Sequence, residues 1–98
     1  MRVKINAVHF KVDKKLEDFI KEKVDKLTSL YEDVVGTDVT LKISNASELE
    51  NKVAEIRLAI PGNDLYAKKQ CKTFEEAADS AIDALKKQLT KYKDKQKA

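Results

Sequence analysis

The clearest periodicity of the chain lies in its final quarter, between Thr73 and about Lys95. Apolar residues recur there at spacings of three and four, which places them on one face of an α-helix. They are Phe74, Ala77, Ala78, Ala81, Ile82, Leu85, Leu89 and Tyr92. Thr73 and Glu76 have the spacing of a capping box, in which the hydroxyl accepts a hydrogen bond from a free backbone N–H of the first turn. The pattern therefore predicts a long amphipathic helix that begins at Thr73.

A second helix is predicted from the N-cap candidate Asp13 to about Tyr31. Its apolar stripe is Leu16, Phe19, Ile20, Val24, Leu27, Leu30 and Tyr31. Alternation of apolar and polar residues predicts four strands, at residues 2–8, 37–44, 52–60 and 65–72. In the second strand Val39, Leu41 and Ile43 should face the core, and in the third Ala54, Ile56, Leu58 and Ile60. The stretch Pro61-Gly62-Asn63-Asp64 has the chemistry of a turn and predicts a hairpin.

The predicted order is β-α-β-β-β-α. The first two strands should be parallel because a helix joins them, and the last three should form an antiparallel meander because short loops join them. Each element has one apolar face, so we expect an α+β fold, a two-layer sandwich with both helices on one face of a four-stranded sheet. Double-stranded-RNA-binding domains have a related arrangement. The other sheet face should be polar, with Arg2, Lys4, Lys42, Glu55, Arg57 and Lys68.

The totals fit one soluble domain over residues 1–98, with 42% hydrophobic and 38% charged residues. The single cysteine, Cys71, excludes an intramolecular disulfide and a cysteine-based zinc site, and it favours a reducing compartment. We interpret Cys71 as a small buried hydrophobe, and His9 as a surface or turn residue. Nothing approaches the roughly 20 apolar residues of a membrane span, so we expect a cytoplasmic protein with no membrane partner.

The net charge of +3 is unevenly distributed, because the last fifteen residues hold six lysines and one aspartate. Lysines near a helix C-terminus interact favourably with the helix dipole and often form a solvated face. The alternative is a phosphate-binding surface. At 100° per residue, Lys87 and Lys91 fall on one flank of the apolar stripe, and Lys86 and Lys93 fall on the other. Lys68, Lys69 and Lys72 precede the helix, so its dipole does not explain them.

No nucleophile–base pair, glycine-rich phosphate loop or H-E-x-x-H motif is present in the sequence. We therefore expect no enzyme activity, no cofactor, no metal site and no small-molecule substrate. RNA binding and protein–protein interaction remain open. Tyr66 alone does not make the exposed aromatic pair of a base-stacking sheet, so an RNA-binding version of this fold should contact phosphates and shape.

Three stretches carry a family resemblance: VKINAVHFKVDKKLEDFIKEKVDKL, LAIPGNDLYAKKQCKTFEEAADSAIDAL and the terminal KKQLTKYKDK. Together they resemble the ribosome hibernation promoting factor / ribosome-associated inhibitor A family, also called the sigma-54 modulation or S30AE family. The resemblance covers essentially the whole chain. It is nearest to the short form, which lacks the second, dimerisation domain of long members, with residues 94–98 expected as a short basic tail.

The resemblance implies a stationary-phase or stress factor that represses translation. Such a protein binds the small ribosomal subunit in the channel for mRNA and for the A- and P-site tRNAs, contacts 16S rRNA and holds 70S ribosomes inactive. It is expected to be monomeric away from the ribosome, and ribosome dimerisation should need another factor. The family's basic residues carry over to Lys86, Lys87, Lys91 and Lys93. Lys68, Lys69, Lys23 and Lys26 are further RNA-binding candidates by position.

Two alternatives accompany this interpretation. A general structured-RNA-binding domain of the double-stranded type predicts a basic N-terminus for the last helix, whereas here that helix begins Thr73-Phe74-Glu75-Glu76, which is acidic. A protein–protein interaction module predicts an exposed apolar patch, which the pattern does not indicate.

Overall fold

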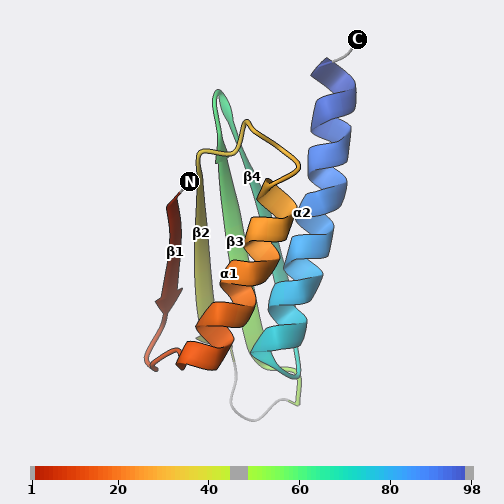
Figure 1. Ribbon diagram of the computed structural model, residues 1–98. Helices are drawn as coiled ribbons and strands as arrows, with labels where there is room; N and C mark the ends of the chain where they lie inside the picture. Colours follow the sequence, from red (N-terminus) through yellow and green to blue (C-terminus); the bar gives the residue numbers. More distant parts are fainter. Residues whose placement is uncertain (1, 45–48, 97–98) are drawn as a thin grey trace.

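A computed structural model of the chain describes residues 2–44 and 49–96, with the side chains of the last helix described as far as Tyr92 (Figure 1). The elements are β1 (Arg2–Ala7), α1 (Lys14–Thr28), β2 (Gly36–Ile43), β3 (Lys52–Ile60), β4 (Asn63–Cys71) and α2 (Phe74–Gln96). The predicted order and the α+β class are confirmed.

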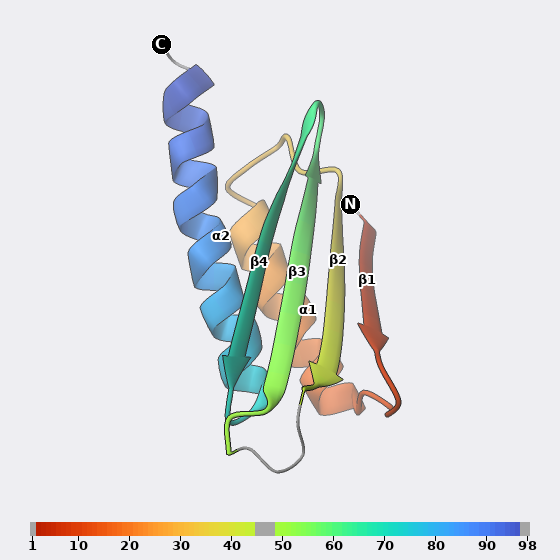
Figure 2. The same ribbon diagram turned by 180° about the vertical axis from the view of Figure 1, so that it is seen from behind.

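The sheet has the strand order β1-β2-β3-β4, so the order in space follows the order in sequence. β1 pairs with β2 in parallel, with Val3 opposite Thr37. β2 with β3, and β3 with β4, pair antiparallel, as the short connections require. Both helices cover the same face (Figure 1), and the view from behind shows the other face bare of helices (Figure 2). The predicted two-layer sandwich is thus confirmed, with β1 and β4 as the sheet edges.

The apolar stripe of α2 forms the centre of the core. α2 packs on β3, on β4 and against α1, so it contacts more of the fold than α1 does. Its buried residues include Ala77, Ala78, Ala81, Leu85 and Leu89. They pack in one cluster with residues of α1 (Leu16, Ile20, Val24, Leu27) and of the sheet (Val39, Leu41, Ile56, Leu58). This burial fixes both the position of α2 and its rotation about its own axis.

Both helices begin at the caps that the sequence predicts. The Asp13 carboxylate accepts a hydrogen bond of 2.7 Å from the Leu16 backbone N–H, and the Thr73 hydroxyl accepts one of 3.1 Å from that of Glu76. The rings of Phe10 and Phe74 stack with their centroids 4.9 Å apart, which joins the β1–α1 connection to the start of α2.

The prediction for the end of α1 is wrong by three residues, because the helix ends at Thr28 and not near Tyr31. The hydroxyls of Thr28 and Ser29 donate to the backbone carbonyls of Val24 and Lys26, and such local bonds compete with helix continuation. Leu30 therefore lies beyond the helix and is 62% exposed, although it was expected in the apolar stripe. Tyr31 still packs against the core.

One strand residue differs from the prediction, and a second, buried one has no position assigned to it in the prediction. Ile43 continues the inward alternation of Val39 and Leu41, but it is the last residue of β2 and is 46% exposed, so the core position predicted for it is wrong. Val53 pairs with Lys42 and Gln70 on the helix-free side of the sheet, outside the main core, yet it is fully buried. The Gln70 amide donates to the Glu50 carbonyl, which brings the chain before β3 close to the end of β4.

The β3–β4 turn is shorter than predicted. Ile60 pairs with Asn63, so only Pro61 and Gly62 form the turn, and β4 begins at Asn63. Gly62 has φ 81°, the value that follows proline in a type II turn. His9 is the only described non-glycine residue with positive φ, at 66°, and it is exposed, as a turn residue should be.

We predict that Gly62→Ala lowers the free energy of unfolding by about 1 kcal/mol, because an L-residue is strained at this φ. Gly36→Ala is the matched control: a Cβ there would meet nothing nearer than 3.6 Å, in ordinary contact with Arg2, and the φ of Gly36 is not positive. Urea unfolding monitored by circular dichroism compares the two variants. Equal losses of stability would contradict the turn assignment.

Candidate nucleic-acid interface

The C-terminal half of α2 presents lysines on both sides of its buried stripe. Lys86 faces a groove between α2 and α1, and Lys87 faces a recess between α2 and β4. The two residues are adjacent in sequence and lie 100° apart around the helix, so the predicted division between two flanks is confirmed for this pair. The lysines therefore lie on both sides of α2, and the basic surface that they form along this helix is called the ridge.

The groove between the helices has a volume of about 430 Å³ and brings Lys23 and Lys26 of α1 together with Lys86 of α2. Asp79 and Asp83 also line it. The Lys23 ammonium lies 3.6 Å from the Asp79 carboxylate and 5.6 Å from the ring centroid of Phe19, so this side chain joins the two helices. The first and last helices therefore share this groove, and lysines of both helices line it.

The recess on the other flank of α2 has a volume of about 440 Å³ and brings Lys69 of β4 together with Lys87. Lys87 lies 3.8 Å from the carboxylate of Asp83, one helical turn earlier. Cys71 also lines this recess; it is half-buried against the core, and its sulfur lies 3.9 Å from the Ser80 hydroxyl. Lysines thus approach α2 from the sheet edge as well as from α1.

The lysines of this ridge fall into two groups. Lys23, Lys26 and Lys87 each have a carboxylate within 4 Å, and for Lys26 it is Glu22 at 3.6 Å. Among the side chains of residues 2–44 and 49–92, no ion pair involves Lys69, Lys86 or Lys91. Exposed pairs contribute at most about 1 kcal/mol, so a phosphate can displace them. The backbone of α2 continues through Lys93, whose side chain lies outside the described part of the chain.

Lys68 does not belong to this ridge. Successive residues of a strand point to opposite faces, so Lys69 points to the helix side of β4 and Lys68 to the bare side. The Lys68 ammonium lies 3.9 Å from the Glu55 carboxylate there. Of the eight predicted RNA-binding residues, the structure therefore brings six to the two helices and the helix side of β4 and leaves Lys68 on the opposite face. The side chain of the eighth, Lys93, lies outside the described part of the chain.

Gln88 holds the basic half of α2 against the sheet edge. Its amide donates a hydrogen bond of 2.9 Å to the backbone carbonyl of Tyr66, which points outward from the edge strand β4. Sequence reasoning missed this contact, although Gln88 stands between the lysines of the motif KKQLTKYK. The available signal was the position of a polar residue, Gln88, near the apolar stripe. Its partner could not be identified from the sequence, because Tyr66 lies 22 residues away.

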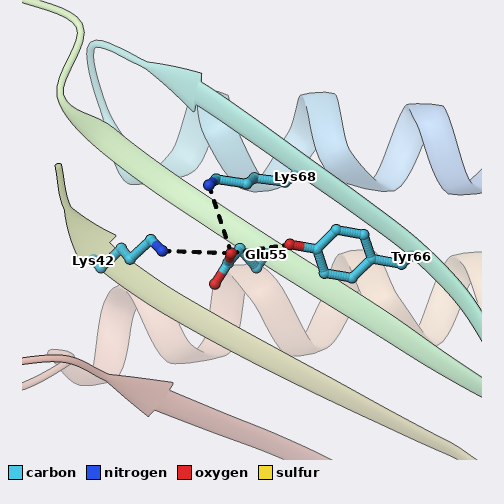
Figure 3. Close-up of polar contacts among 4 residues, drawn as sticks. All are labelled: Lys42, Glu55, Tyr66 and Lys68. Carbon is cyan, nitrogen blue, oxygen red and sulfur yellow. Dashed lines mark hydrogen bonds and ion pairs between the residues drawn. The ribbon is translucent and has the colours of Figure 1, made fainter.

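A second polar cluster lies on the helix-free face and is centred on the Glu55 carboxylate (Figure 3). One oxygen accepts a hydrogen bond of 2.9 Å from the Tyr66 hydroxyl and lies 3.5 Å from the Lys42 ammonium and 3.9 Å from that of Lys68. The pKa of Tyr66 is raised above its ordinary value of 10.0. Desolvation of the hydroxyl is the largest cause, and the hydrogen bond to Glu55 is the second. Tyr66 therefore remains a neutral hydrogen-bond donor at physiological pH.

The chemistry that these surfaces offer is the binding of anions. Among the described residues, no group of three or more His, Cys, Asp and Glu side chains could hold a metal ion. In the same part of the chain, no helix is both long and apolar enough to cross a membrane.

Comparison with known proteins gives one family and several relatives. The sequence matches the family described as sigma 54 modulation protein / S30EA ribosomal protein over residues 3–97. A ribosome hibernation promoting factor from Pseudomonas putida is 32% identical over 98 residues, which cover all of this chain and 92% of that protein. A ribosome hibernation promoting factor from Escherichia coli K12 is 27% identical over 97 residues, which cover 99% of this chain and 98% of that protein.

Solved structures share the fold. A ribosomal subunit interface protein from Coxiella burnetii matches with a TM-score of 0.84 at 17% identity, over 95% of this chain and 98% of that one. The N-terminal domain of Protein Y from Thermus thermophilus matches with a TM-score of 0.79 at 20% identity, over 94% of this chain and 99% of that one. These likenesses support the two-layer architecture.

We predict that Gln88→Ala lowers the free energy of unfolding by about 1 kcal/mol, because it leaves the Tyr66 carbonyl without its side-chain partner. Lys91→Ala is the control, since that neighbouring exposed side chain makes no ion pair in the described structure, and its change should stay within about 0.5 kcal/mol. Urea unfolding of both variants provides the comparison. A Gln88→Ala variant as stable as Lys91→Ala would show that the bond does not hold α2 to β4.

Proposed function

The chain belongs to the sigma 54 modulation protein / S30EA ribosomal protein family, and we propose that it is a ribosome hibernation factor. In this proposal it binds the small ribosomal subunit and represses translation under stress or in stationary phase. The relatives named as ribosome hibernation promoting factors support the role. The observation that carries it is the convergence of lysines from α1, β4 and α2 on the two flanks of one rigid helix.

The proposed mechanism is electrostatic anchoring followed by steric occlusion, with no turnover of substrate. Lys69, Lys86 and Lys91 have no carboxylate partner in the described structure and are the first anchors for 16S rRNA phosphates. Lys23, Lys26 and Lys87 add contacts by exchanging a weak ion pair for a phosphate. Neutralised phosphates release counterions, which gives binding free energy that weakens as salt rises.

The shape of the protein suits occlusion. The molecule is elongated, with extents of 47 × 23 × 19 Å, and the basic half of α2 lies toward one end (Figure 1). When anchored there, the remainder of the body would fill the channel for mRNA and for the A- and P-site tRNAs. RNA helices are recognised largely through backbone and shape, which agrees with a ridge of lysines that is not built around an aromatic pair.

The two alternatives have weaker support. A protein-interaction module needs one apolar patch, but the most exposed large apolar residues described, Leu49 and Leu30, lie on loops at opposite ends of the sheet. A general double-stranded-RNA binder needs a basic start to its last helix, whereas the first turn of α2 carries Glu75 and Glu76.

We predict that the triple variant Lys86→Ala, Lys87→Ala, Lys91→Ala loses most of its binding to 70S ribosomes and small subunits. Removing three phosphate contacts should weaken binding at least about tenfold and lower the slope of log affinity against log salt by roughly two to three. Co-sedimentation on sucrose gradients at low and raised salt measures both quantities.

The control removes the same charge elsewhere, through Lys11→Ala, Lys14→Ala and Lys15→Ala. These residues are exposed near the start of α1, at the other end of the molecule from the basic half of α2 (Figure 1). The control variant should co-sediment like the parent protein. Equal losses of ribosome binding for both triple variants would show that the effect comes from net charge alone and not from the basic half of α2. Absence of the parent protein from ribosomes at low salt would refute the proposed function.

A further inference from the structure

The helix-free face of the sheet contains an aromatic side chain that is both exposed and held in place. Tyr66 is 45% exposed, the only aromatic residue among the exposed large apolar side chains of the described structure. Its hydroxyl is held by Glu55 at 2.9 Å, so the ring extends from β4 toward β3 (Figure 3). A ring held in this way loses little side-chain entropy when a ligand stacks on it.

Arg57 supplies a second planar group beside the ring. It stands opposite Tyr66 in the β3–β4 register, so both side chains project from the same face. Arg57 is exposed and makes no ion pair with the described side chains of residues 2–44 and 49–92. Asp38 of β2 stands opposite Arg57 in the β2–β3 register, and its carboxylate lies 3.6 Å from the Arg2 guanidinium.

These residues surround a recess of about 280 Å³, which is lined by Asp38, Thr40, Glu55, Arg57 and Tyr66. Lys42 and Lys68 approach Glu55 from the two neighbouring strands. Asp38, the other carboxylate of the recess, pairs with Arg2. Four cationic side chains (Arg2, Lys42, Arg57 and Lys68) thus accompany two carboxylates (Asp38 and Glu55), which leaves a net charge of +2 on this part of the face. The site combines a planar platform, hydrogen-bonding groups and excess positive charge.

We propose that this face binds a nucleotide of single-stranded RNA, in addition to the lysine ridge on the helix side. The base stacks on the Tyr66 ring and beside the Arg57 guanidinium, and a flanking phosphate lies against Lys68 and Lys42. Single-stranded nucleic acids are commonly held by aromatic and arginine planes with a cationic groove beside them. The Thr40 hydroxyl is within the same recess to meet the polar edge of the base.

The register explains why one tyrosine suffices here. A sheet that stacks bases through aromatic residues needs at least two planes, and the sequence offers only Tyr66 on this face. The β3–β4 pairing supplies the second plane from Arg57. The site lies on the face opposite the helices, so it does not depend on the proposed contact between α2 and ribosomal RNA.

The test is fluorescence anisotropy of a fluorescein-labelled adenosine hexaribonucleotide with the full chain at low salt. Tyr66→Ala should weaken binding roughly tenfold, the loss expected for one stacked base. Tyr66→Phe keeps the ring and should retain most of the affinity. Arg57→Gln should weaken binding severalfold. The position is exposed, so this substitution should leave the strand intact. The Lys86, Lys87 and Lys91 triple alanine variant should bind the hexamer like the parent protein.

Three outcomes would overturn the inference: hexamer binding unchanged by Tyr66→Ala and Arg57→Gln, no hexamer binding by the parent protein, or a loss of hexamer binding confined to the α2 triple variant. A fluorescein-labelled hexaglutamate that binds as tightly as the RNA would also overturn it, because charge alone would then account for the affinity. Ribosome co-sedimentation of the same variants keeps the two proposals separate. If the sheet face bound no RNA, the ribosome binding that depends on α2 would still be lost in the Lys86, Lys87 and Lys91 triple variant and kept by the parent protein.

Discussion

The burial of the α2 stripe is the constraint on which the rest of the structure depends. Ala77, Ala78 and Ala81 are fully buried, and their small side chains let the first half of α2 lie close to the sheet and to α1. Leu85 and Leu89 continue the buried stripe farther along the helix. A helix packed on two sides cannot rotate without exposing this stripe. The orientation of Lys86, Lys87 and Lys91 therefore follows from the packing of the apolar residues of α2.

Carboxylates within the basic ridge account for its modest excess of charge. Asp79 and Asp83 lie among the lysines and pair with Lys23 and Lys87 at 3.6 and 3.8 Å. Such pairs reduce repulsion between lysines in the free protein, but each is exposed, screened by salt and weak. A polyanion with closely spaced charges can therefore replace them. A net charge of only +3 is thus compatible with binding RNA, because charge is locally concentrated and its internal partners are exchangeable.

The fold was predictable because its signals are local. Helix periodicity identified the α2 stripe and placed Lys86 and Lys87 on different flanks, and strand alternation placed Lys68 and Lys69 on opposite faces. The features that were missed depend on contacts between distant segments. The bond from Gln88 to the Tyr66 carbonyl needs α2 docked on β4, and the position of Arg57 opposite Tyr66 needs the strand register. The early end of α1 depends on side-chain hydrogen bonds that periodicity does not reveal.

The central claim is that the basic half of α2 lies against the RNA of the small subunit, and directed hydroxyl-radical cleavage tests it most directly. Lys87→Cys in a Cys71→Ser background provides one attachment point for iron–EDTA on the ridge, and Lys15→Cys provides a second at the start of α1. In complexes with 70S ribosomes, radicals from position 87 should cleave 16S rRNA at a compact set of sites, with a different and weaker pattern from position 15. Cleavage from position 87 that is absent, or confined to the large-subunit RNA, would contradict the account.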